Sequence, residues 1–92
     1  MDKYMEKAVV RSQINIAEGI FDLWLDAPII AGLARAGQFV NVYCNDKSRL
    51  LPRPISICEA DSKNGRIRLV YRVAGKGTAE FSELVPGETI DL

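Results

Sequence analysis

The segment RIRLVYRV, residues 66–73, decides the fold class of this chain. Every second residue is apolar, which puts one set of side chains on one face of an extended strand: Ile67, Leu69, Tyr71 and Val73. The opposite face carries Arg66, Arg68, Val70 and Arg72. A repeat of two residues predicts a β-strand with one buried face. The turn sequence DSKNG before it predicts a reversal from a preceding strand.

Further strands are predicted on the N-terminal side. The runs KAVVRSQINIA and IFDLWLD are expected to form a hairpin that turns at Glu18-Gly19. A short segment around Gly32 is compatible with one helical turn, which Gly37 would stop. The run QFVNVYC alternates, with Phe39 and Tyr43 opposed to Val40, Val42 and Cys44. ISICEA, residues 55–60, continues as a strand after two prolines.

The C-terminal side changes character after the glycines of AGKGTAEFSEL. Thr78 is a plausible N-cap, and the apolar spacing that follows predicts a helix to about Val85. PGETIDL then reads as a turn and a last strand. Five or six short strands with one late helix predict a small antiparallel barrel.

Composition excludes several classes of function. The 92 residues suffice for one domain, and 12 Lys+Arg balance 12 Asp+Glu, which argues against nucleic acid as the main ligand. No apolar run approaches the roughly 20 residues that cross a bilayer, and the N-terminus lacks the apolar core of a secretory signal. We therefore expect a cytoplasmic protein without a membrane segment.

The chain has two cysteines, Cys44 and Cys58, and no histidine. Both cysteines lie in apolar, strand-like runs, which predicts buried thiols in a reducing compartment, with a disulfide the less favoured interpretation. Zinc and iron–sulfur sites normally take four ligands, so we expect no metal site. Without histidine the usual base of a Ser–His or Cys–His pair is missing, and we assign no catalytic residue.

The sequence GKGT at residues 75–78 resembles phosphate-binding loops in its chemistry, because glycines bare their backbone N–H groups before a helix. It fits neither a P-loop, since Gly77 follows Lys76, nor a dinucleotide fingerprint, since Glu80 stands where glycine is needed. A glycine turn that enters a surface helix is the simpler interpretation of this motif alone.

The sequence RPIS at residues 53–56 places an arginine between prolines. The constrained backbone can aim the Arg53 guanidinium at an anion with less entropy to lose on binding. Ser56 adds a hydroxyl and a backbone N–H. An exposed arginine at the start of an edge strand is an equally good explanation of this motif alone.

Tyr71 and Arg72 form a third feature. They lie on opposite faces of a regular strand, so both reach one pocket only at a bend or strand end. We expect Arg72 to reach phosphate and Tyr71 to line the ligand; the alternative is Tyr71 in the core and Arg72 in solvent. An arginine, a Tyr-Arg pair and a glycine turn that converge would suit a diphosphate bearing an aromatic ring, as in a flavin dinucleotide.

The order of motifs GQFVNV, RPISI, VYRVAGKGT and LVPGETIDL resembles the flavin-binding domain of the ferredoxin–NADP reductase superfamily. The chain in particular resembles the electron transfer subunits of bacterial dihydroorotate dehydrogenase that use NAD. The resemblance covers nearly the whole chain from Lys7 onward. It implies an all-β fold, a six-stranded antiparallel Greek-key barrel with one short helix late in the chain, which holds FAD in an extended pose.

The resemblance also implies a set of FAD-binding residues: Arg53, Pro54, Ile55, Ser56, Val70, Tyr71, Arg72, Gly77 and Thr78. Arg53 would bind the diphosphate, Ser56 would lie near the isoalloxazine, and Gly77 and Thr78 would present N–H groups to the diphosphate. Many members of the superfamily stack an aromatic side chain on the flavin where this chain has Ile55, so stacking there should be weaker.

Such subunits continue with a glycine-rich turn, a nicotinamide-binding domain and a cysteine cluster for a [2Fe-2S] centre, none of which is found in residues 1–92. We therefore expect an isolated FAD-binding barrel that does not turn over NADH alone. Its expected partner is the dihydroorotate dehydrogenase catalytic subunit, with NAD reached through the missing domain. The alternatives are the flavin domain of a hydrogenase or sulfur reductase subunit, and a non-catalytic docking barrel that forms a homodimer through an open strand edge.

Overall fold

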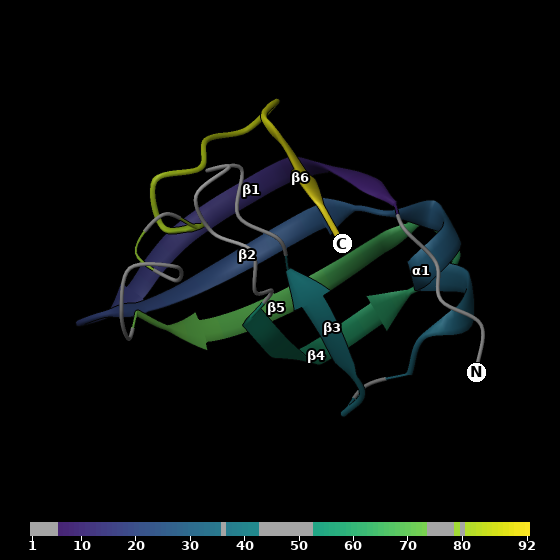
Figure 1. The fold of residues 1–92 in the computed structure, drawn as a ribbon, viewed down its shortest axis with the longest axis horizontal. Helices are drawn as coiled ribbons and strands as arrows, with labels where there is room; N and C mark the ends of the chain where they lie inside the picture. The colour runs from purple at the N-terminus through teal and green to yellow at the C-terminus, as the bar shows by residue number, and fades with distance from the viewer. Residues whose placement is uncertain (1–5, 36, 43–52, 74–78, 80) are drawn as a thin grey trace.

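The computed structural model of the chain describes residues 6–35, 37–42, 53–73, 79 and 81–92. In chain order, the elements of this part are β1 (Lys7–Ala17), β2 (Ile20–Asp26), α1 (Pro28–Leu33), β3 (Phe39–Val42), β4 (Arg53–Asp61), β5 (Arg66–Arg72) and β6 (Thr89–Asp91). The strands form one antiparallel sheet in the order β3-β4-β5-β2-β1-β6 (Figure 1).

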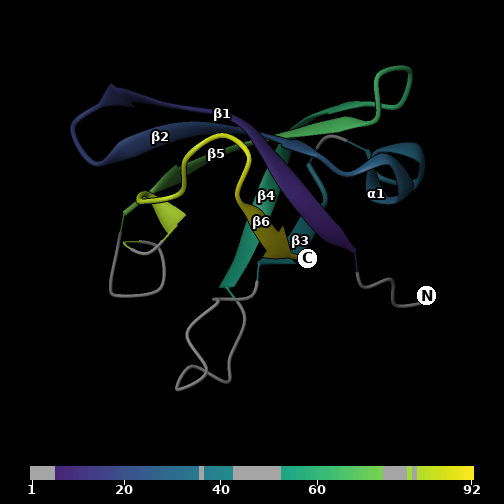
Figure 2. The same ribbon diagram turned by 90° about the horizontal axis from the view of Figure 1, so that it is seen from above.

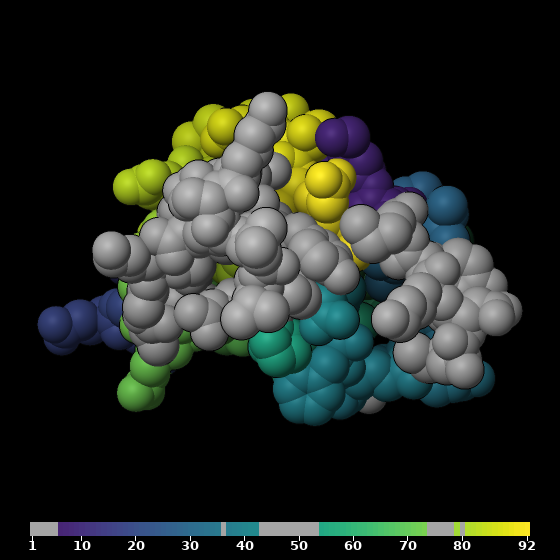
Figure 3. Space-filling view, in the orientation of Figure 1, coloured from purple at the N-terminus to yellow at the C-terminus, as the bar shows by residue number. Residues whose placement is uncertain are grey.

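The hairpin β1–β2 turns at Glu18-Gly19, as the sequence predicts. Gly19 has φ of 71°, a left-handed conformation that glycine adopts without steric cost. The tip of this hairpin projects from the rest of the barrel (Figure 1 and Figure 3). Two register shifts interrupt β1, between Val10 and Ser12 and between Asn15 and Ala17. Such bulges increase the twist of a strand, and they let β1 curve around the barrel.

Strand β4 turns the corner of the barrel by changing its partner. Its first residues pair with β3, from Arg53 opposite Val42 to Ser56 opposite Phe39. Its last residues pair with β5, from Ile57 opposite Leu69 to Asp61 opposite Arg66. One strand shared in this way bends the sheet back on itself.

The two ends of the described chain meet at β1 and β6. Lys7 lies opposite Asp91, and Glu6 and Leu92 exchange backbone hydrogen bonds of 3.2 and 2.9 Å. The end of β6 lies beside β3 in both ribbon views (Figure 1 and Figure 2), so the sheet is almost closed. The predicted six-stranded antiparallel barrel is confirmed.

The core lies inside this barrel and consists of the inward residues of every strand. The alternation predicted for residues 66–73 is confirmed, since Ile67, Leu69 and Tyr71 are buried while Arg72 is exposed. β3 alternates as predicted too, with Val40 and Val42 buried and Phe39 exposed. Burying one side chain of this size stabilises the folded state by about 2 kcal/mol. An apolar residue at every second position therefore favours the fold in which that face of each strand is buried.

The helical parts differ from the prediction of one late helix. The helix α1 is early, where the sequence analysis allowed one turn around Gly32, and ends at Leu33, before Gly37. Late in the chain, Ala79 and Phe81 are helical but Ser82 and Glu83 form a turn, so the helix predicted to reach Val85 is shorter. The N–H of Leu84 donates to the oxygen of Phe81 at 3.1 Å, and Pro86, which lies in the next turn, disfavours a helical conformation of the residue before it.

The helix α1 is capped by a residue that the sequence analysis did not single out. The buried Glu6 carboxylate accepts hydrogen bonds from the backbone N–H groups of Ile29 (3.1 Å) and Ile30 (2.9 Å). The first N–H groups of a helix have no intrahelical partner, and a carboxylate there also meets the positive end of the helix dipole.

Among the described residues, no helix has the length and apolar character of a membrane span.

The prediction of buried thiols is wrong for Cys58, which is a free and exposed cysteine. Ile55 and Ile57 take the inward positions of β4, so Cys58 faces outward. Cys44 lies outside the described residues.

Candidate functional site

The strands β4 and β5 separate at the N-terminal end of β4, and residues 53–56 and 70–72, which include most of the predicted site residues, lie on the two separating segments; the place where they separate is called the opening below. Their pairing runs from Asp61–Arg66 to Ile57–Leu69 and stops there. Beyond it, residues 53–56 pair with β3, while residues 70–72 pair with β2 on the opposite side. Figure 2 shows the two strands diverging. Within the described residues, the facing edges of these two segments have no ladder partner.

The arm formed by β4 carries the RPIS motif. Pro54 and Ser56 are exposed, and Ile55 is buried at 7% exposure opposite Val40. Arg53 is the first residue of β4, which agrees with its predicted place at the start of this strand. Its side chain is not among those that the structure describes. Ser56 therefore lies on the outer face of β4, and Ile55 lies on the face toward the core.

The arm formed by β5 carries Val70, Tyr71 and Arg72 on alternating faces. Val70 is half-buried on the outer face opposite Asp22. Arg72 ends β5, as expected, and is exposed with no carboxylate partner among the described residues. A ligand in the opening can contact all three only if it uses backbone groups as well as side chains.

Tyr71 lies in the core, which is the alternative weighed in the sequence analysis. Its ring stacks on Phe21 at a centroid distance of 5.8 Å and meets Phe81 edge-on at 6.3 Å. Its hydroxyl donates a hydrogen bond of 2.5 Å to Oε1 of Gln13. Burial raises the pKa of this hydroxyl well above its ordinary value, so it stays protonated and remains a donor.

Gln13 is a residue of this region that sequence reasoning missed. Its Nε2 donates hydrogen bonds to the backbone oxygens of Phe81 (2.8 Å) and Leu84 (2.9 Å). The amide thus joins β1, β5 and the segment that follows the GKGT motif. The only signal in the sequence is a polar residue within a strand, and its inward direction depends on the bulge after Val10.

The outer face of β2 and β5 uses the other arginines of the RIRLVYRV segment in ion pairs. Arg68 binds Asp22 through two hydrogen bonds of 2.9 and 2.8 Å, and its guanidinium lies 5.9 Å from the centroid of the Trp24 ring. This pairing raises the pKa of Arg68 further. Arg66 pairs with Asp26 at 3.2 Å. Arg72 is the arginine of this segment that is left at the opening.

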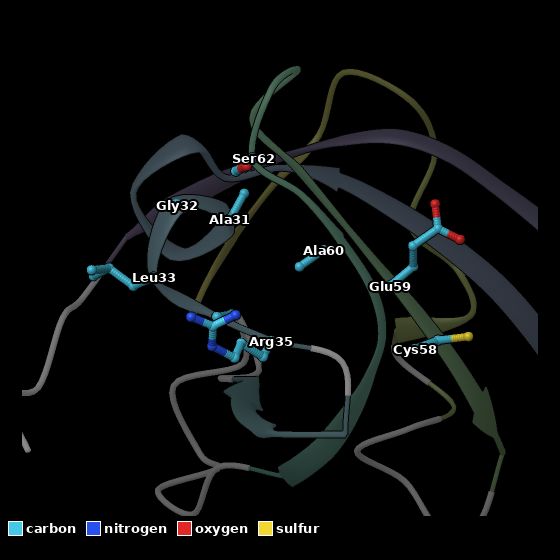
Figure 4. Close-up of a pocket in the computed structure, with 9 residues that line it drawn as sticks. Ala31, Gly32, Leu33, Arg35, Cys58, Glu59, Ala60 and Ser62 are labelled. Atoms are coloured by element: carbon cyan, nitrogen blue, oxygen red, sulfur yellow. The ribbon is translucent and has the colours of Figure 1, made fainter.

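A shallow hollow of about 510 Å³ lies elsewhere, between the end of α1 and the C-terminal half of β4 (Figure 4). Its lining residues are Ala31, Gly32, Leu33, Ala34, Arg35, Cys58, Glu59, Ala60 and Ser62. None of the predicted site residues lines it, so it is separate from the opening between β4 and β5.

Gly77 and Thr78, the remaining predicted site residues, lie outside the described residues. In the part of the chain that the structure describes, no group of three or more His, Cys, Asp or Glu residues is arranged to hold a metal ion.

Comparisons with known proteins relate the chain to electron transfer subunits. It is 42% identical over 88 residues to the electron transfer subunit of dihydroorotate dehydrogenase B (NAD(+)) from Streptococcus pneumoniae, a match that covers 96% of this chain and 34% of that protein. The corresponding subunit of Bacillus caldolyticus is 39% identical over 88 residues, with 95% and 34% covered. The chain thus spans about a third of the length of these curated relatives. No family model matches it.

Solved structures support the fold. The chain matches an NADH-dependent reduced ferredoxin-NADP oxidoreductase, studied for flavin-based electron bifurcation, with a TM-score of 0.76 and 30% identity over 97% of this chain and 31% of that one. It also matches a flavohemoglobin from Malassezia yamatoensis with bound FAD and heme, with a TM-score of 0.71 and 97% and 24% covered. At 15% identity the second match concerns the fold alone.

Proposed function

We propose that the chain is the FAD-binding module of a dihydroorotate dehydrogenase B electron transfer subunit, because it is similar to such subunits over about a third of their length and shares its fold with a ferredoxin-NADP oxidoreductase. The full subunit would pass electrons from dihydroorotate oxidation to NAD, a step of pyrimidine biosynthesis in the cytoplasm. The module's partner would be the catalytic subunit, and NAD would bind in a region that the match does not cover. The [2Fe-2S] centre expected for such subunits would likewise belong to regions outside residues 1–92.

The separation of β4 from β5 beyond the Ile57–Leu69 pair is the observation that carries this proposal. It sets the RPIS segment and the VYR segment on facing sides of one opening, where the backbone edges between them have no ladder partner among the described residues. A planar ring inserted edge-on into such an opening can accept and donate hydrogen bonds to both strands. The donor chemistry also fits a dinucleotide, because arginines are the usual partners of a diphosphate.

We assign roles to the residues of the opening on this basis. Arg53 and Arg72 bind the diphosphate, and Gly77 and Thr78 give it backbone N–H groups. Ser56 contacts the isoalloxazine ring, which Pro54, Ile55 and Val70 flank. Tyr71 contributes its backbone, because its side chain is buried and its hydroxyl is bonded to Gln13. The bound flavin supplies the redox chemistry, and the residues of the chain bind and orient it.

Titration with FAD tests the proposal. We expect the visible absorbance of the flavin to change on addition of the purified chain, and FAD to stay with the protein through gel filtration. Because the relatives are about three times longer, regions outside the match would add contacts, so the affinity of this chain should be modest. Absence of both signals at high flavin concentration would contradict a flavin site in this chain.

A second candidate is the flavin domain of another NAD(P)H-dependent reductase, such as a hydrogenase or sulfur reductase subunit. The match to the NADH-dependent oxidoreductase favours it, because a different enzyme shares this fold at 30% identity. FAD binding alone does not separate the two candidates. Co-purification of the full subunit with a dihydroorotate-oxidising partner would support the first one. A docking barrel without flavin predicts instead a tight complex or homodimer that survives Arg53→Ala, with no effect of that substitution on flavin affinity.

A further inference from the structure

Phe39 is a large apolar side chain that the fold leaves in water. It is the first residue of β3 and is 71% exposed, the largest exposed fraction among the large apolar side chains of the described residues. The neighbouring Val40 is buried in the core, so Phe39 lies on the outer face of the strand. The barrel itself therefore does not use the phenyl ring for packing.

Phe39 lies directly opposite Ser56 of the RPIS segment. The next residue of β4, Ile57, donates its N–H to the oxygen of Gln38 at 2.6 Å, and its oxygen accepts from the N–H of Gly37 at 2.8 Å. Hydrogen-bonded and non-hydrogen-bonded pairs alternate along an antiparallel ladder, so Phe39 and Ser56 form a non-hydrogen-bonded pair. The side chains of such pairs lie closest to each other, with Cα atoms about 4.5 Å apart.

The same hydrogen bonds set the direction of the Ser56 backbone. Ile57 points its N–H and C=O toward β3, and successive residues of a strand point these groups to opposite sides, so those of Ser56 point toward the opening. The side chains of Ser56 and Phe39 are exposed on the outer face of the sheet, whereas Ile55 lies on the inner face with 7% exposure. Ser56 thus belongs to the edge of the opening, and the phenyl ring stands beside it on the outer face.

The sizes of the two side chains let the phenyl ring reach the opening. A serine fills little space above its strand, so the ring of Phe39 can lean across Ser56 without a clash. A planar ring held by its edge in the opening, as in the proposed function, has one face toward the side of Ile55 and the other toward the outer side. Contact of Phe39 with this outer face would remove apolar surface of both rings from water.

We propose that Phe39 is a further binding residue of the flavin site, which contacts the outer face of the isoalloxazine ring from across Ser56. The inference rests on the proposed function, in which Ser56 contacts this ring. It adds a third strand, β3, to a site formed by β4 and β5. Ile55 offers an aliphatic surface on the inner side. Phe39 offers an aromatic one on the outer side, where two rings prefer an offset-stacked or edge-on arrangement.

Titration of Phe39→Ala with riboflavin and FAD tests this inference. Both flavins carry the isoalloxazine ring, so the affinity for each should fall by the same factor, about fivefold, which corresponds to one aromatic contact. The midpoint of chemical denaturation should not change, because the fold does not bury this side chain. Unchanged affinity for both flavins in the folded variant would overturn the inference. So would a loss confined to FAD, which would place Phe39 against the diphosphate or the adenine instead.

Two further variants show whether the aromatic ring at this place is the cause. Phe39→Tyr keeps the aromatic face and should bind both flavins within about twofold of the unmodified chain. Ile14→Ala is the matched control, because Ile14 is 59% exposed on β1, which two strands separate from β4. It should leave both affinities unchanged. Equal losses in Ile14→Ala and Phe39→Ala would contradict a specific contact of Phe39.

Quenching of flavin fluorescence by iodide gives a readout of the outer face of the ring itself. Iodide should quench bound riboflavin more strongly in Phe39→Ala than in Phe39→Tyr, because the alanine leaves this face open to solvent. Equal quenching in the two variants would overturn the contact, whatever the affinities are.

The outcomes separate failure of this inference from failure of the proposed function. If the unmodified chain binds neither flavin, the proposed function is wrong and the role of Phe39 falls with it. If the unmodified chain binds both flavins and Phe39→Ala binds them equally well, only the role of Phe39 is wrong. Gel filtration tests the other occupant of this surface, a second copy of the chain. A dimer that dissociates in Phe39→Ala with flavin affinity unchanged would assign the ring to a protein contact and overturn the inference.

Discussion

The two ends of the β4–β5 pair differ in their contacts. At the closed end, Asp61 lies opposite Arg66, and the Asp61 carboxylate accepts bonds from the backbone and side chain of Asn64 at 3.1 and 2.7 Å. At the open end, the same two strands part after Ile57 and Leu69, and Arg72 stands exposed. Ladder pairs and the Asn64 hydrogen bonds stabilise one end, and at the other the facing strand edges have no ladder partner among the described residues.

The largest effect on this pair of ends is expected from truncating Leu69, the buried side chain at the point where the two strands separate. Leu69 is fully buried opposite Ile57, so Leu69→Ala should lower the free energy of unfolding by about 3 kcal/mol through lost burial and a cavity. Chemical denaturation measures it. Val70→Ala is the control, because Val70 is half-buried on the outer face, and it should cost about 1 kcal/mol or less. Equal effects would contradict the assignment of Leu69 to the core.

The stability of the closed end, where Asp61 pairs with Arg66, is tested by a substitution in the turn between β4 and β5. Gly65 has φ of 69°, and a Cβ built on it would lie 3.1 Å from Cβ of Pro28. Gly65→Ala should therefore cost about 2 kcal/mol of unfolding free energy, from backbone strain and crowding against α1. Gly32→Ala is the matched control. Nothing lies within 4 Å of a Cβ built on Gly32, and alanine favours the helical conformation of α1 more than glycine does. A neutral Gly65→Ala would mean that the turn adapts freely.

The open end is tested by its charge. Arg72→Gln should weaken FAD binding by about tenfold, the usual range for one charge-assisted contact to phosphate, and leave riboflavin affinity and stability nearly unchanged. Isothermal titration with both flavins measures it. Arg11→Gln is the control, since Arg11 is exposed on the outer face 3.7 Å from Asp26. The assignment of Arg72 fails if both variants bind FAD equally well.

The smallest expected effect is a pH dependence at the closed end. Hydrogen bonds from Asn64 hold the pKa of Asp61 below its ordinary value of 3.8. A carboxyl with a lowered pKa adds stability that is fully present above the ordinary value and is lost as the pH falls through the lowered one. The stability difference between the unmodified chain and Asp61→Asn should therefore be constant above about pH 5 and shrink below 3.8. Thermal unfolding across this range measures it, and a difference independent of pH would exclude this role.

The structure confirms the predicted fold, whereas the FAD-binding roles of the site residues stay predictions. Alternating apolar residues in β3 and β5 and the hairpin turn at Glu18-Gly19 follow from local sterics and burial, and the structure confirms all three. From the strand pattern alone, Tyr71 could either line a ligand or pack in the core, because the alternation gives the face of the strand and not what covers that face. In the structure Tyr71 lies in the core, where its ring contacts the buried Phe81 and its hydroxyl donates to the Gln13 amide.

The sequence alone predicted the set of strands, the inward faces of β3 and β5 and the resemblance of its motifs to a flavin-binding barrel. Only the tertiary structure decided where β4 leaves β5, that Glu6 caps α1 and that Gln13 anchors the segment at Phe81 and Leu84. The first set depends on neighbours within a few residues. The second depends on contacts between residues 23 to 71 positions apart, which form only when the barrel brings those residues together.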